Sequence, residues 1–210
     1  MKLFRKHFLL FTSILVLCAS CSKSPYAFLQ NREPDKECLR TLKPKYSSAL
    51  YKTSVDVTGK YLSGLLIIKK MEDGSTRIVF SNEMGLTFFD FEFFENEFRV
   101  LHCMKKLNRT VVLRALRKDL GMLIQSGYEY QKVKSYRSDS AFYYAYLDGN
   151  ETTYLITDTN CTKLQRIEHA SKRKKKVFMN FTGAGTGLPD SIYIAHQGFE
   201  FNIALKKLER

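Results

Sequence analysis

The stretch RIVFSNEMGLTFFDFEFF (residues 77–94) contains two apolar segments, residues 78–80 and 86–94, joined by the four residues NEMG. Asn82 and Gly85 favour a tight β-hairpin turn, because Gly adopts a positive φ at little steric cost. Turn tips usually carry small polar residues, yet Met84 stands at this one. The residue either contacts an apolar partner outside the fold or folds back onto Phe88, since single exposed apolar residues are common.

The same alternation of apolar and polar residues recurs over most of the chain after residue 47. The exception is residues 108–124, where Leu116, Leu120 and Ile124 follow a helical spacing, with Asn108 as the expected N-cap and Gly127 as the stop. We therefore predict a mainly β fold with helices (α+β), in which about eleven antiparallel strands curl into a half-barrel. One apolar face of such a sheet needs a cover, and the helix supplies it.

A sheet wrapped around a helix leaves an apolar cavity if the helix does not fill the space. Alternation along the strands and helical spacing select eight candidates for its lining. They are Leu66, Ile68, Val79, Phe89, Phe91, Leu116, Leu120 and Ile203.

The N-terminal residues have the composition of an export leader. Lys2, Arg5 and Lys6 precede an apolar stretch that is too short to span a bilayer. The following CASC resembles the cleavage site of bacterial lipoprotein signals, in which the cysteine after the cut is acylated. Cys21 fits this role better than Cys18, because small Ser20 precedes Cys21 whereas bulky Leu17 precedes Cys18. An ordinary secretory leader cleaved nearby is the alternative.

Three regions follow from this pattern. Residues 1–20 are a signal peptide, residues 21–46 a lipidated N-terminal tether rich in Pro, Ser and charge, and residues 47–210 the folded domain. Cleavage removes three basic residues and no acidic one, so the formal charge falls from +13 to +10. Such a surplus attracts anionic partners, and the export leader disfavours nucleic acid among them.

A basic run at residues 172–176 marks a second candidate contact region. A run of this kind is either a solvated hairpin tip or a site for anionic lipid headgroups. Its members are Lys172, Arg173, Lys174, Lys175 and Lys176.

The sequence gives little support for a catalytic, metal or cofactor site. The histidines are scattered, no nucleophile elbow is present, and no CxxC spacing occurs. The GAGTG segment at residues 183–187 lacks the Lys and the helix of a phosphate-binding loop. Cys38, Cys103 and Cys161 allow at most one internal disulfide, and the sequence leaves the pair open. We expect no enzyme activity.

The turn motif also carries a resemblance to a known family. RIVFSNEMGLTFFDFEF resembles the hairpin of the LolA/LolB-like lipoprotein carriers and receptors, in which a protruding apolar residue, here Met84, helps to place lipoproteins in the outer membrane. VTGKYLSGLLIIKK, LRKDLGMLI and GLPDSIYIAHQGFEFNIALKKLER are similar to other segments of that family. The resemblance implies a half-barrel whose apolar cavity is capped by helices and receives acyl chains from a soluble periplasmic carrier.

Two hypotheses of function follow. In the first, the protein is a monomeric outer-membrane lipoprotein that accepts acyl chains of lipoproteins, or another lipid, on the periplasmic side. Ser22 agrees with this location by resemblance to proteobacterial lipoproteins, and residues 22–26 lack the acidic run that directs surface export in some Bacteroidetes. In the second, the protein is a structural lipoprotein of an envelope complex. An open apolar cavity of several hundred Å³ would favour the first, and a filled interior the second.

Overall fold

A computed structural model describes residues 24–57, 59–95, 97–183 and 187–209. The predicted signal peptide and lipidation site, residues 1–20 and Cys21, lie outside the described residues. The described chain forms one antiparallel sheet of thirteen strands that does not close on itself, together with the helices α2 (Lys36–Leu42) and α3 (Thr110–Leu123). The mainly β fold with a covering helix is thus confirmed, and the strand number exceeds the expected eleven.

The strands are β1 (Gln30–Arg32), β2 (Ser48–Val57), β3 (Lys60–Lys70), β4 (Thr76–Ser81), β5 (Thr87–Phe94), β6 (Glu97–Cys103), β7 (Val133–Arg137), β8 (Phe142–Asp148), β9 (Glu151–Thr157), β10 (Leu164–Ser171), β11 (Lys175–Thr182), β12 (Ser191–His196) and β13 (Phe201–Lys207). Their order in the sheet is β1-β7-β8-β9-β10-β11-β12-β13-β2-β3-β4-β5-β6. The pairing of β13 with β2 joins the end of the domain to its beginning, and β1 and β6 are the two edges.

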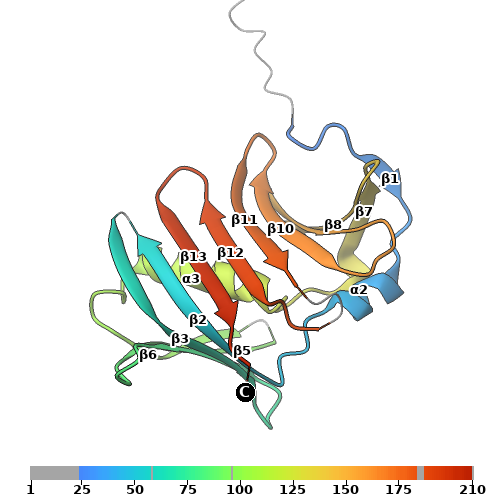
Figure 1. Ribbon diagram of the computed structural model, residues 1–210. Helices are drawn as coiled ribbons and strands as arrows, with labels where there is room; N and C mark the ends of the chain where they lie inside the picture. The colour runs from blue at the N-terminus through green and yellow to red at the C-terminus, as the bar shows by residue number, and fades with distance from the viewer. Residues whose placement is uncertain (1–23, 58, 96, 184–186, 210) are drawn as a thin grey trace, which may run out of the picture.

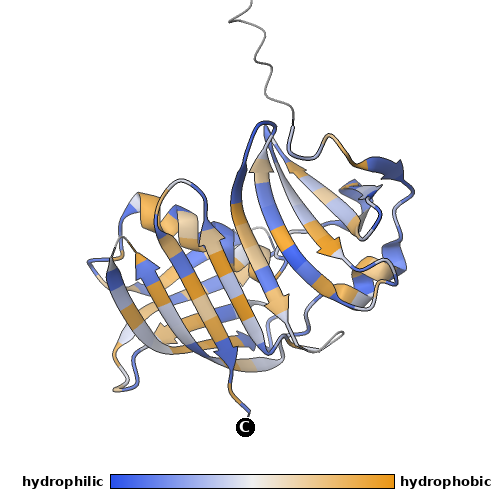
Figure 2. Cartoon of the chain, turned by 45° about the horizontal axis from the view of Figure 1, so that its top comes forward, coloured by the Kyte–Doolittle hydropathy of each residue, from blue (hydrophilic) through white to orange (hydrophobic). Residues whose placement is uncertain are grey.

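The sheet bends strongly, and α3 lies against its concave side behind β12, β13 and β2 (Figure 1). Alternation explains the side-chain placement. In β2 and β4, buried residues alternate with more exposed ones, as expected for strands with one face on a core. Figure 2 shows the resulting mixture of apolar and polar positions along each strand. The core therefore lies between the concave face of the sheet and α3.

Helix α3 starts one residue later than the sequence suggests. The backbone N–H of Asn108 donates to the carbonyl of Met104 at 3.0 Å, so residues 104–108 form a turn and Asn108 is not the N-cap. Arg109 takes that position without a side-chain hydrogen bond. At the other end Gln125, with φ of 52°, adopts the left-handed conformation two residues before Gly127. The helix thus ends before the expected glycine stop.

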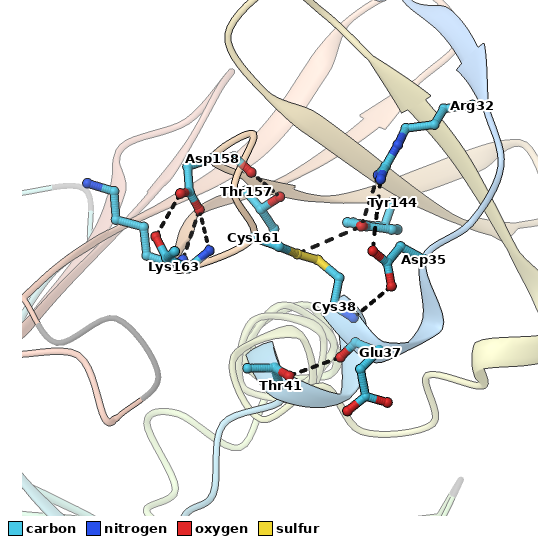
Figure 3. Close-up of a disulfide and its surroundings, with 11 residues drawn as sticks. Arg32, Asp35, Glu37, Cys38, Thr41, Tyr144, Thr157, Asp158, Cys161 and Lys163 are labelled. Carbon is cyan, nitrogen blue, oxygen red and sulfur yellow. Dashed lines mark hydrogen bonds and ion pairs between the residues drawn. A yellow bond between two sulfur atoms is a disulfide. The ribbon is translucent and has the colours of Figure 1, made fainter.

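Residues 24–46, expected to form a tether, pack against the sheet. Strand β1 pairs with β7, and Asp35 caps α2 by accepting a 3.0 Å hydrogen bond from the backbone N–H of Cys38. A disulfide joins Cys38 to Cys161 in the β9–β10 connection, with a Cα–Cα distance of 5.7 Å (Figure 3). The segment is therefore part of the folded body from residue 24 onward. Cys103 is the free thiol among the described cysteines.

Candidate functional site

The β4–β5 turn holds its backbone rigidly and exposes its apolar tip. The side-chain Oδ1 of Asn82 accepts hydrogen bonds from the backbone N–H groups of Met84 at 3.1 Å and Leu86 at 2.7 Å. Gly85, with φ of 87°, supplies the positive φ that the turn requires. Met84 is 92 % exposed, so its side chain does not pack on buried Phe88. An apolar side chain is thus presented to the surroundings by a turn with little freedom to withdraw it.

Other exposed apolar residues lie at the same end of the strands. Because the strands are antiparallel, the β2–β3, β4–β5 and β12–β13 turns share one rim of the sheet, together with residues 104–109 that lead from β6 into α3. The exposed apolar side chains at or beside these connections are Tyr61, Met84, Leu86, Val111 and Phe199. The nearby basic residues are Lys60, Lys105, Lys106 and Arg109. The same connections carry the acidic residues Asp56, Glu83 and Glu200, so this rim combines apolar side chains with charges of both signs.

The space between α3 and strands β2, β3, β4, β5, β12 and β13 is filled. The enclosed space there is about 10 Å³, which is no larger than a single water requires. Five of the eight predicted lining residues border this space: Leu66, Phe89, Leu116, Leu120 and Ile203. Ile68 and Phe91 are fully buried in the same core without bordering it. The chain therefore brings these seven side chains together, but they pack against one another and leave no cavity for a ligand.

Val79 does not belong to this group. Its neighbours Ile78 and Phe80 are both buried, so alternation places Val79 on the opposite face of the sheet, where it is half-buried. The assignment of Val79 to the interior was wrong because both faces of this strand carry apolar residues. Sequence reasoning also missed the inward-facing Phe80 and Ile194, which border the enclosed space.

A buried polar contact fastens α3 to the sheet. Asp119 is fully buried, and its Oδ2 lies 2.8 Å from Nε2 of His196 on β12. Its Oδ1 has no hydrogen-bond partner among the described residues. Burial raises the pKa of the Asp119 carboxyl, and the hydrogen bond to His196 opposes that rise. A carboxyl on the apolar face of a helix is an unusual core residue, and helical spacing alone gave no sign of it.

A second cluster lies where α3 meets β9, β10 and β11. Glu151 pairs with Lys176 and with Lys118 on α3, the latter at 3.0 Å. Nε2 of buried His169 lies 2.6 Å from Glu151 Oε2, and its Nδ1 lies 3.0 Å from the hydroxyl of Thr153. The hydrogen bonds from Lys176, Lys118 and His169 together lower the pKa of Glu151 to about 2, although burial opposes them. Glu151 therefore stays charged at neutral pH and holds the helix to the sheet.

The basic run divides into two parts. Lys175 pairs with Glu168 at 2.9 Å, and Lys176 pairs with Glu151. Lys172, Arg173 and Lys174 form the connection between β10 and β11, and no ion pair within the described chain involves them. The side chain of Lys175 also lies 5.4 Å from the ring centre of Tyr26, which places the basic tip beside the first described residues (Figure 1).

Open hollows surround the C-terminal end of α3. One, of about 610 Å³, lies between α3, the β5–β6 turn and β8. Another, of about 900 Å³, lies between the α2–β2 connection, the β3–β4 turn and residues 124–127. The two share Phe93, Glu95, Ser126 and Gly127, so they meet at the β5–β6 turn. Their walls come from segments far apart in the sequence.

Metal and membrane-spanning features are absent from the described part of the chain. No group of three or more His, Cys, Asp or Glu residues there could hold a metal ion. None of the helices in the described ranges is long and apolar enough to span a membrane.

Comparison with known proteins gives distant likenesses of fold. No family model matches the sequence, and no curated protein matches it. Among solved structures, a domain from Vibrio parahaemolyticus described as a "putative outer membrane lipoprotein-sorting protein domain" is similar with a TM-score of 0.44 and 7 % identity, covering 83 % of this chain and 88 % of that chain. A DUF1329 family protein from Desulfovibrio piger is similar with a TM-score of 0.44 and 10 % identity, covering 82 % and 88 %.

Proposed function

We propose that the protein is a monomeric, lipid-anchored module on the periplasmic side of the outer membrane. It receives acyl chains of lipoproteins, or another lipid, from a soluble carrier and passes them into the membrane. The proposal includes no catalytic step and no cofactor. The observation that carries it is the β4–β5 turn, where hydrogen bonds to Asn82 fix the backbone and Met84 is 92 % exposed.

The chemistry of Met84 suits this role. Methionine is unbranched and polarisable, so it adapts to irregular apolar partners such as acyl chains. Exposing an apolar side chain on a rigid turn brings no benefit to folding, because the side chain is as wet in the folded state as in the unfolded state. The other exposed apolar side chains of this rim extend the surface that would meet a membrane.

The proposed anchor at Cys21 would keep the domain close to the bilayer. Ser24, where the described body begins, is the third residue after Cys21, and three extended residues span at most about 10 Å. The basic tip at Lys172, Arg173 and Lys174 lies next to this entry point and would then meet anionic headgroups. The Cys38–Cys161 disulfide supports an oxidising compartment such as the periplasm.

Uptake of an acyl chain into the interior requires α3 to move. The enclosed space of about 10 Å³ cannot admit a chain while Leu116 and Leu120 occupy the concave face. The contacts of Asp119 and Lys118 with the sheet would have to break first. The Lys118 contact is partly exposed to water already, and buried polar pairs such as Asp119–His196 are weak sources of net stability.

The filled interior favours a second function. A domain whose concave face is occupied by its own helix could serve as a structural lipoprotein that binds a partner in an envelope complex. The two functions differ in whether the folded protein takes up lipid.

Binding of a hydrophobic fluorescent probe separates the two functions. The lipid-accepting function predicts that the folded protein binds the probe and that acyl chains displace it. Failure to bind any such probe by a sample with native circular dichroism would favour the structural function. The anchor is tested independently by metabolic labelling with a radioactive fatty acid. Cys21→Ala should abolish labelling, and labelling that persists would move the anchor to Cys18.

A further inference from the structure

The hollow of about 900 Å³ beside the C-terminal end of α3 has the size of a ligand site. Small-molecule sites usually enclose about 300–1,000 Å³ and combine an apolar wall with a few polar groups. Here the apolar wall includes Phe93, Phe94 and Ile124. Phe93 and Ile124 are buried in the core, so this wall is an outward extension of the packed interior.

The charge of the hollow has one predominant sign. Its border carries four basic residues, Arg40, Lys43, Lys45 and Lys70, against one acidic residue, Glu95, among the described residues that line it. The ion pair of Arg40 with Glu37, at 3.6 Å, joins two exposed side chains and neutralises little of this charge. The Nζ of Lys70 donates to the carbonyl of Gly74, which is neutral and leaves the positive charge in place.

Tyr46 lines this hollow and also a neighbouring one of about 320 Å³ beside Phe181 and Pro189. Tyr46 is buried, and its Oη meets no hydrogen-bond partner among the described residues. Burial raises the pKa of Tyr46, so the hydroxyl remains protonated and able to donate.

We propose that this hollow binds an anionic glycerophospholipid, with one acyl chain along Phe93 and Phe94 and the phosphodiester among Arg40, Lys45 and Lys70. The complementarity of charge favours this ligand over a neutral lipid, because a basic border adjacent to an apolar wall matches a negative head adjacent to an acyl chain. The neighbouring hollow of about 610 Å³, which meets this one at Phe93 and Glu95, leaves room for a second chain.

This inference rests on the lipid-handling part of the proposed function and adds a second lipid ligand to it. The acyl groups of a lipidated cysteine are attached through thioether, ester and amide bonds and bring no negative charge. A basic site therefore binds an acidic phospholipid in preference to the lipid of a lipoprotein. In the proposed function, transfer of the lipoprotein depends on Met84, at the opposite rim of the sheet, and not on this hollow.

Photolabelling of the full-length protein tests the assignment. The protein is mixed with phosphatidylcholine vesicles that contain a small amount of a photoactivatable lipid. The photoactivatable lipid is either phosphatidylglycerol or phosphatidylcholine, and both carry the same diazirine-bearing acyl chain. Labelled peptides are identified by mass spectrometry. The double variant Lys45→Glu/Lys70→Glu reverses two charges at the border of the hollow. Lys69→Glu reverses the exposed neighbour of Lys70, which does not line the hollow, and serves as the matched control.

We expect phosphatidylglycerol to label the peptides containing residues 93–95 and 124–127, and the double variant to reduce this labelling roughly tenfold while Lys69→Glu does not. Excess inorganic phosphate should leave the labelling in place, because phosphate has no apolar part. Three results would each overturn the assignment. They are equal labelling by both lipids, equal labelling of the double variant and Lys69→Glu, and loss of labelling in excess phosphate. Labelling of α3 or the concave face without these peptides would refute this site while supporting the proposed function, and labelling of no peptide would count against both.

Discussion

Oδ2 of Asp119 on α3 lies 2.8 Å from Nε2 of His196 on β12, and the other carboxylate oxygen has no partner in the described chain. This contact joins the helix that fills the interior to the strand next to the end of the domain. The contact is also a weak point in the packing of α3, because a buried carboxylate with one unpaired oxygen retains part of its desolvation cost.

Removing His196 should therefore destabilise the protein more than removing both partners. We expect His196→Leu to lower the free energy of unfolding by about 3–5 kcal/mol at pH 8, because the Asp119 charge is left uncompensated. Asp119→Leu/His196→Leu should recover at least half of this loss, and urea titration measures both. The loss in His196→Leu should shrink as the pH falls, since the raised pKa of Asp119 lets the carboxyl become neutral. A double variant less stable than His196→Leu would contradict the interpretation.

Local chemistry made part of this structure predictable. Asn82 and Gly85 specify the β4–β5 turn without help from distant residues, and alternation correctly assigned Phe89, Phe91 and Ile203 to the interior. These features depend on the turn itself or on the period of a strand, and the sequence displays both directly.

Features that depend on distant partners were less predictable. Strand β1 has the sequence QNR, which shows no strand pattern and is held by pairing with β7. The Cys38–Cys161 pair depends on α2 lying against the β9–β10 connection. The basic hollow combines four segments, so no local motif could reveal it. The predicted placement of Val79 was wrong because alternation defines the two faces of a strand but does not say which face lies inside.

The disulfide should account for a large part of the stability of the N-terminal segment. It links residues 123 positions apart, and loops of that length correspond to about 3–5 kcal/mol in the chain-entropy description. We expect Cys38→Ser/Cys161→Ser to lose this amount in denaturant titrations. Under non-reducing conditions, mass spectrometry after alkylation should find the two cysteines joined and Cys103 alkylated. A linked peptide that contains Cys103 would contradict the pairing.

Gly64 sets how closely the end of β4 approaches β3. A Cβ at this position would overlap the backbone carbonyl of Ser81, which has no freedom to withdraw without shifting the β4–β5 turn. Gly64→Ala should therefore cost about 1–3 kcal/mol of stability. Gly121→Ala in α3 is the control, because its Cβ meets only the Phe93 ring at an ordinary 3.6 Å, and alanine in a helix should gain about 0.5–1 kcal/mol. Equal effects of the two substitutions would exclude the close approach as the cause.

The central claim is that the exposed side chain of Met84 enters an apolar environment during function. The direct measurement is transfer of a labelled lipoprotein from its soluble carrier to liposomes by wild type, Met84→Leu and Met84→Glu at matched stability. Tyr193→Glu, at another exposed apolar position on β12, is the control. A substitution at an exposed position shifts the free energy of unfolding by less than about 0.5 kcal/mol, so folding should be unaffected. Moving the Glu carboxylate from water into an apolar environment, by contrast, costs several kcal/mol. We predict that Met84→Leu and Tyr193→Glu transfer like wild type and that Met84→Glu does not. Equal transfer by all four proteins would contradict the claim.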